Sequence, residues 1–201
     1  MLIQIAWDQR LNHDKLLRQE PVVHRVKNFD HDSGKEIYES LNKAIRGGQP
    51  FFPVVIDSYG GEVYGLLSII EAFTSSPIPV ATFIQGKAMS CGAMLAAMGT
   101  KGYRFMSPHA HILIHHVSST NKGIVPQIKE DVRQSEYLDQ QIFKMVSTHC
   151  GHPPNYFLDK LKPLEGADWY IKPEEAAELG LIDAVKSPIF DVKIGVQMNI
   201  L

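Results

Sequence analysis

The sequence predicts an α/β fold built around a largely parallel β-sheet. Short apolar runs rich in Val, Ile and Phe alternate with longer segments in which apolar residues recur every three or four positions. The first kind of segment is typical of buried strands and the second of amphipathic helices. Strands that alternate with helices need crossover connections, which make neighbouring strands parallel. No repeat, low-complexity stretch or linker interrupts the pattern, so we expect a single domain over residues 1–201.

The first half of the chain is predicted to hold three strands, each followed by a helix. The strands span 21–26, 51–56 and 79–86, and the helices span 32–48, 62–73 and 90–99. In the first helix Ile37, Leu41 and Ile45 recur every four residues, which gives the helix one apolar face. Glycine pairs mark the end of that helix and the turn after the second strand.

The second half is predicted to contain the longest helix. Strands are expected at 103–106, 111–117 and 181–185, and helices at 126–148, at 173–180 and shortly after a Pro-Pro pair at 153–154. The long helix carries an apolar stripe of Ile128, Val132, Ile142 and Met145, and such a stripe needs a partner surface. We therefore expect the segment 118–160 to leave the body of the domain as an arm.

Composition excludes several classes of protein. The chain is 44% hydrophobic and 21% charged, with a formal net charge of −2. This balance offers no basic patch, so we expect neither nucleic acid nor a membrane surface as a partner. With no membrane-spanning apolar run and no signal-peptide pattern, a cytoplasmic protein is expected. Cys91 and Cys150 have no metal-ligand spacing and are too few for a disulfide framework.

Ser90 lies in an unusual context, GKAMSCGAM, where an apolar run becomes rich in Ala and Gly. A strand is predicted before it and a helix after it, so the first N–H groups of that helix have no intrahelical partner. Two interpretations stay open. Ser90 either caps the helix, a common use of serine, or is a nucleophile whose oxyanion those N–H groups stabilise. The turn at Gly60-Gly61 would let a substrate approach the backbone closely.

A serine nucleophile needs a base and a group that orients the base. Alternation along 111–117 places His115 and His116 on opposite faces of the predicted strand. Asp168 lies between small residues and a strand-like aromatic run, from which its carboxylate could reach inward. The histidines at 109–116 have no companion carboxylate or thiolate at ligand spacing, so we expect no metal site.

Three segments together resemble a known family. GKAMSCGAMLAAMGTKGYRFMSPHAHILIHH, residues 86–116, is similar to the active-site stretch of the proteolytic subunit of the Clp protease (ClpP) family. DSYGGEVYGLLSIIEAF, residues 57–73, resembles the family's N-S-P-G-G segment and its helix, and DWYIKPEEAAELGLID, residues 168–183, resembles its closing motif. The likeness extends from about Val22 to Val185, and the intervals of 29 residues from Gly61 to Ser90 and 25 from Ser90 to His115 suit it.

The resemblance implies specific roles for five residues. Ser90 would be the nucleophile, His115 the general base and Asp168 the orienting carboxylate. The backbone N–H groups of Gly61 and Cys91 would form the oxyanion hole. The implied activity is that of an ATP-dependent Clp-type serine endopeptidase, which acts on peptides and unfolded proteins and uses no cofactor.

The resemblance also implies an assembly. The fold would be the spiral of ββα units shared with crotonases, and the segment 118–160 its protruding handle helix. The handle packs two heptameric rings into a closed barrel, so a homo-oligomer of fourteen chains is expected. The sequence has no P-loop, so ATP dependence would come from a separate Clp-type ATPase unfoldase. Residues before Val22 do not resemble the axial loops linked with docking of that unfoldase, so we expect that docking to be weak.

The chain departs from the family pattern at several positions near the proposed site. Asp57 replaces an asparagine, Tyr59 a proline and Cys91 a methionine, Lys87 and Met89 alter the serine box, and Ser118-Ser119 replaces a glycine pair. Three other functions remain as alternatives. They are a crotonase-like acyl-CoA enzyme, a Ser–Lys peptidase that uses Lys87, and a catalytically silent ring subunit.

Overall fold

The computed structural model describes residues 21–187, so the expectation about axial loops, which rests on the first residues, lies outside them. The strands are β1 (His24–Val26), β2 (Phe52–Ser58), β3 (Val80–Met89), β4 (Arg104–Met106), β5 (His111–Ile114), β6 (Trp169–Ile171) and β7 (Ala184–Val185). The helices are α2 (Ser33–Arg46), α3 (Val63–Thr74), α4 (Cys91–Ala97), α5 (Val125–Cys150), α6 (Tyr156–Leu161) and α7 (Pro173–Glu178), with a 3-10 turn η1 (Lys162–Leu164). The predicted α/β fold is confirmed.

The sheet is almost entirely parallel, as predicted. Its main path runs β1-β2-β3-β4-β7, and among the described strands only the pair β5–β6 is antiparallel. Strand β3 has two partners on one edge, since residues 82–84 pair with β4 and residues 87–89 pair with β5. The change of partner falls at Gly86, whose φ is +86°. The second half of β3 therefore carries the chain away from β4 and toward β5.

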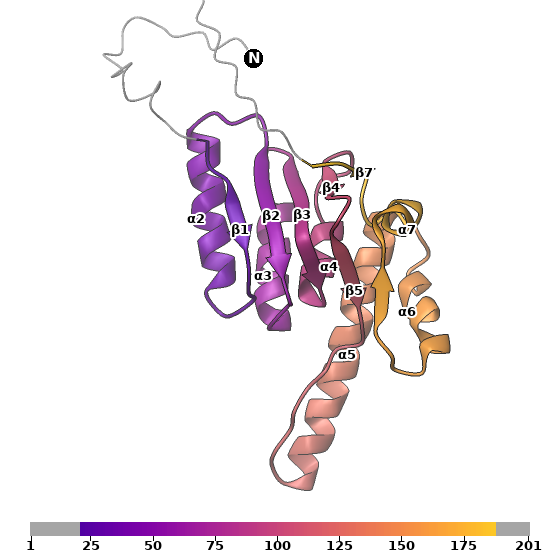
Figure 1. Ribbon diagram of the computed structural model, residues 1–201. Coiled ribbons are helices and arrows are strands. Elements are labelled where there is room, and N and C mark those ends of the chain that lie inside the picture. Colours follow the sequence, from indigo (N-terminus) through magenta and orange to yellow (C-terminus); the bar gives the residue numbers. More distant parts are fainter. Residues whose placement is uncertain (1–20, 188–201) are drawn as a thin grey trace, which may run out of the picture.

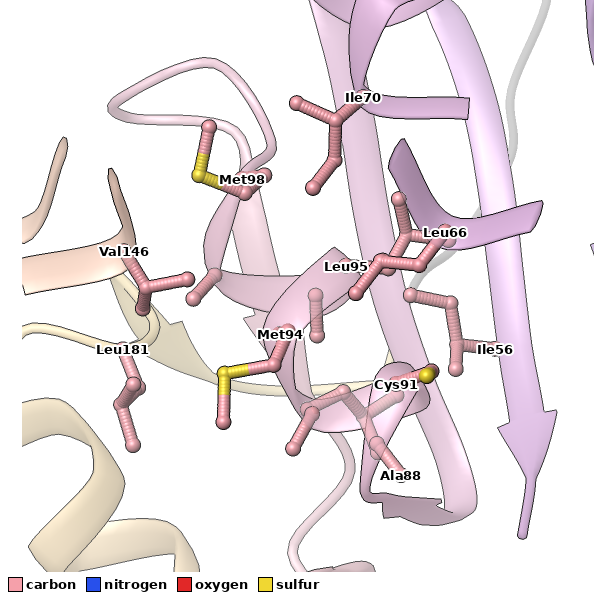
Figure 2. Close-up of a cluster of buried hydrophobic side chains, with 14 of the residues drawn as sticks. Ile56, Leu66, Ile70, Ala88, Cys91, Met94, Leu95, Met98, Val146 and Leu181 are labelled. Atoms are coloured by element: carbon pink, nitrogen blue, oxygen red, sulfur yellow. The ribbon is translucent and has the colours of Figure 1, made fainter. Parts of the chain in front are cut away.

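Helix α4 lies at the centre of the hydrophobic core. All seven of its residues are buried, and α3 and α4 both lie behind the strands in Figure 1. Figure 2 shows the side chains around α4, which come from β2, α3, α5 and the segment before β7: Ile56, Leu66, Ile70, Val146 and Leu181. Each such side chain contributes about 1.5–3 kcal/mol when fully buried, so the position of α4 is firmly fixed.

Helix α5 has two parts with different surroundings. From Leu138 onward it packs on the body, with Ile142, Phe143 and Val146 buried. The preceding part extends beyond the sheet, and the segment that leads to it from β5 runs alongside (Figure 1). Ile124, Val125 and Val132 are exposed there. The protruding helix expected within 118–160 is thus the N-terminal part of α5, whereas its C-terminal part belongs to the core.

Candidate active site

Ser90 stands at the junction of β3 and α4 in a conformation that L side chains rarely adopt. Its φ is +54° and its ψ is −122°. The backbone is held on both sides, because its N–H donates to the Leu113 carbonyl at 2.9 Å and its carbonyl accepts from Ala93 N–H at 3.0 Å. Ser90 is the N-cap residue of α4, but its side chain makes no capping hydrogen bond, so the structure does not support a capping role for the hydroxyl. A serine held in a sharp strand-to-helix turn is the arrangement of a nucleophile elbow.

Two glycines bring a second stretch of backbone against Ser90. A Cβ placed on Gly60 would lie 2.8 Å from the Ser90 Cβ, and one placed on Gly61 would lie 2.4 Å from the Phe29 carbonyl oxygen. Both residues also have positive φ, at +105° and +154°. Only glycine fits such close contacts. The structure therefore brings the Gly60-Gly61 turn and the first turn of α4 to the two sides of Ser90.

The Cys91 side chain links the first turn of α4 to the Gly60-Gly61 turn. Its Sγ–H donates to the Gly61 carbonyl at 3.2 Å, and the side chain points into the apolar cluster of Figure 2. Burial raises the pKa of the Cys91 thiol, although hydrogen bonds to Gly61 and Ser90 oppose the effect. The thiol is thus a neutral group in the core. The Cys91 backbone N–H, as the first of α4, has no partner within the helix.

His115 lies just past the end of β5, and the pairing register brings it near Ser90. Met89 pairs with Leu113 and the Ser90 N–H donates to the Leu113 carbonyl, so His115 lies two residues beyond the point where β3 and β5 stop pairing. The His115 imidazole is half-buried, and its Nδ1 lies 2.5 Å from the His116 carbonyl oxygen. A carbonyl only accepts, so Nδ1 carries the proton and, in the neutral ring, Nε2 is left as the proton acceptor. This is the tautomer that a general base requires.

Asp168 lies immediately before β6, opposite His115. Ile114 pairs with Trp169 across the antiparallel ladder, so its extension by one residue places Asp168 beside His115. The Asp168 side chain is exposed, and within residues 21–187 it has no hydrogen bond or ion pair. The β5–β6 register therefore places Asp168 beside His115, and Ser90 directly follows the last residue of β3 that pairs with β5. Within residues 21–187 no hydrogen bond joins the side chains of Ser90, His115 and Asp168, and the His115 Nδ1 proton is donated to the His116 carbonyl.

Lys87, Asp57 and Tyr59, three of the departures from the family pattern, form one cluster. Lys87 Nζ lies 2.8 Å from Asp57 Oδ1 and 4.2 Å from the centre of the Tyr59 ring. The hydrogen bond to Asp57 raises the pKa of the Lys87 ammonium. A lysine base needs the opposite shift, so this geometry speaks against the Ser–Lys alternative. In the sequence, the opposite charges of Asp57 and Lys87, which lie on neighbouring strands, could have indicated this contact.

The described residues contain no group of three or more His, Cys, Asp and Glu side chains that could hold a metal ion. No helix within residues 21–187 is long and apolar enough to cross a membrane.

A comparison with protein families gives one clear match. The model of the Clp protease family matches residues 15–188, which is most of the chain. The matched range includes every element described above, from β1 to β7. It also includes the turn at Ser90, the glycine pair and the ends of β5 and β6. The chain belongs to the Clp protease family.

Proposed function

We propose that this chain is the catalytic subunit of a Clp-type serine endopeptidase. The observation that carries the proposal is the backbone of Ser90, held at positive φ between β3 and the buried helix α4 and flanked by a glycine turn. This geometry presents a hydroxyl between two sets of backbone N–H groups. Membership of the Clp protease family supports the same activity and implies peptide substrates.

The reaction assigns one task to each group. Ser90 Oγ attacks the peptide carbonyl carbon while His115 Nε2 takes the hydroxyl proton. The resulting oxyanion accepts hydrogen bonds from Gly61 N–H and Cys91 N–H, and one such donor is worth about 10²–10³ in rate. His115 then gives its proton to the leaving amine. Water, deprotonated by His115, hydrolyses the acyl-enzyme and restores Ser90.

Asp168 is proposed as the carboxylate that orients His115 during the reaction. The register of β5 and β6 supports this role, because it brings the two residues opposite each other. The His115 Nδ1 proton serves one strong acceptor at a time, and in the described conformation that acceptor is the His116 carbonyl. The proposal therefore includes a small turn of the imidazole toward Asp168.

The proposal extends to one peptidase domain per chain, closed rings of chains and an ATPase partner. The family implies ring-like oligomers, and the exposed apolar residues of α5 offer a surface for them. Stacked heptameric rings would enclose the Ser90 sites, so folded proteins would need an unfoldase. Short peptides would enter unaided.

The test is cleavage of a short fluorogenic peptide without ATP. Ser90→Ala should abolish cleavage, His115→Ala should reduce it almost as far, and the double variant should be hardly worse, because triad residues act as a unit. Asp168→Asn should lower kcat by roughly 10³–10⁴. His116→Ala is the matched control and should retain most activity.

Three outcomes would refute the assignment. If the unmodified chain cleaves no peptide and a fluorophosphonate does not label Ser90, the protein is a silent ring subunit or a crotonase-like enzyme. If Ser90→Ala cleaves normally, Ser90 is not the nucleophile. If His116 proves essential and His115 dispensable, the register of the triad is wrong.

A further inference from the structure

Asp139, on the part of α5 that packs against the body, binds the chain just after the proposed base. Its Oδ2 accepts from His116 Nδ1 at 2.7 Å, and its Oδ1 accepts from Val117 N–H at 2.8 Å. The Asp139 side chain is only 15% exposed, so this carboxylate works in a partly dehydrated place. Both oxygens are therefore engaged by adjacent residues of the segment that leaves β5.

The second of these contacts reaches His115 through a single peptide group. The Val117 N–H that donates to Asp139 and the His116 carbonyl that accepts from His115 Nδ1 belong to the same planar amide. The N–H and C=O of a trans amide point in opposite directions, so this amide is held from both ends. A carboxylate on the N–H side also polarises the carbonyl and strengthens it as an acceptor.

We propose that Asp139 is a positioning residue for His115, acting through the amide between His116 and Val117. Before the imidazole turns toward Asp168, this contact keeps the proton of the His115 imidazole on Nδ1, which leaves Nε2 unprotonated and ready to receive the Ser90 proton. The hydrogen bond from His116 adds a second attachment, and its ring packs edge-on against Phe143, with centroids 6.2 Å apart. The consequence for catalysis rests on the proposed function, whereas the tautomer of His115 does not.

The kinetic test uses the full chain and four variants. Asp139→Ala should lower kcat several-fold, because only the fraction of His115 with its proton on Nδ1 stays competent as a base, with KM nearly unchanged. Asp139→Asn keeps the shape but can accept from only one of the two donors, so it should fall between Asp139→Ala and the parent chain. His116→Ala keeps the Val117 contact and should retain most activity. Glu136→Ala removes a carboxylate one turn earlier on α5 and should change nothing.

A second measurement does not depend on activity. In full chains labelled with ¹⁵N-histidine and studied at pH 8, His115 should show a protonated Nδ1 and an unprotonated Nε2. Asp139→Asn and Asp139→Ala should mix the two tautomers, while Glu136→Ala should leave the spectrum unchanged. Light scattering on every variant identifies any loss of activity that comes from lost assembly.

The outcomes separate the two proposals. A His115 spectrum that is the same in Asp139→Ala as in the parent chain overturns the positioning role, whatever the activities are. A rise in kcat for Asp139→Ala overturns the positioning role too, because the His116 carbonyl would then be holding the His115 imidazole away from its catalytic position. If instead Ser90→Ala cleaves normally while the tautomers respond to Asp139 as expected, the proposed function fails and the positioning role stands.

Discussion

At the scale of single residues, the neighbours Ser90 and Cys91 of the GKAMSCGAM segment differ in how deeply they are buried. Ser90 stands in the turn, whereas the Cys91 side chain is 4% exposed and packs in the core. Because only the thiolate reacts and burial raises the pKa of the Cys91 thiol, Cys91 is poorly suited to nucleophilic chemistry. The proximity of a thiol to Ser90 is thus not a sign of a cysteine peptidase.

We therefore expect iodoacetamide at pH 7.5 to leave peptidase activity intact. Cys91 should remain unmodified by mass spectrometry after an hour in the folded protein and become modified after unfolding in urea. Burial raises the pKa of the Cys150 thiol as well. Cys150 should therefore react as Cys91 does, only after unfolding, and it serves as an internal control for the alkylation. Rapid alkylation of Cys91 with loss of activity would show that the thiol reaches the site.

The resemblance predicts one site for Ser90, Gly61 and His115, and the structure describes the close contact of the glycine turn with Ser90. The sequence did not reveal Asp139. The residue lies 23 positions after His116 on a different element, and spacing along the chain carries no information about that contact. The contact exists only because the C-terminal part of α5 packs on the core. Its detection needs the tertiary structure.

At the scale of elements, the helices were predicted more accurately than the strands. Helix α2 carries the expected apolar face, with Ile37 and Leu41 buried. Strand β3 runs three residues past its predicted end at Gly86, because Gly86 bends the strand toward a new partner instead of ending it. Strand β5 ends at Ile114 rather than at Val117, since its neighbour β3 turns into α4 at Ser90 and the ladder has no further partner.

The buried arginine of β4 connects this strand with the end of α4 and with the segment between α7 and β7. The Arg104 side chain is 5% exposed and bonds to Asp183 at 2.6 Å, to the Gly180 carbonyl at 2.7 Å and to the Ala97 carbonyl at 3.3 Å. Asp183 also accepts from the N–H of Gly102 at 2.7 Å. Burial alone would raise the pKa of Asp183, but its bonds to Arg104 and to backbone N–H groups outweigh that effect and lower the pKa.

Asp183→Asn should lower the free energy of unfolding by about 3 kcal/mol at pH 7, because it leaves the Arg104 charge buried without its counter-ion. A carboxyl with a lowered pKa contributes stability above its unfolded pKa of about 3.9 and loses it as the pH falls through the folded value. The difference between the variant and the parent chain should therefore shrink below about pH 4. Urea titrations at pH 7 and pH 3.5 measure it. Equal differences at both pH values would contradict the account.

At the scale of the whole molecule, the protruding part of α5 exposes apolar side chains to solvent. Ile124 and Val125 are each 65% exposed and Val132 is 45% exposed. Apolar side chains gathered on one protruding element favour association. The chain should therefore behave in solution as a particle many times heavier than 22.5 kDa.

Val132→Glu should shift this particle to smaller species and lower peptidase activity with it. The matched control is Gln141→Glu, which adds the same charge elsewhere on α5 and should leave the mass unchanged. Light scattering at micromolar concentration gives both masses. A parent chain that is monomeric under these conditions would rule out the assembly.

The backbone of Ser90 also has a consequence for how stable this protein can be. A non-glycine residue at such a φ and ψ raises the free energy of the folded state by about 1–3 kcal/mol. Ser90→Gly would remove that energy at the expense of roughly 0.5–1 kcal/mol of unfolded-chain entropy. The inactive Ser90→Gly variant should thus melt several degrees above both the parent chain and Ser90→Ala. Selection for activity would then hold the natural chain below a stability that is one substitution away.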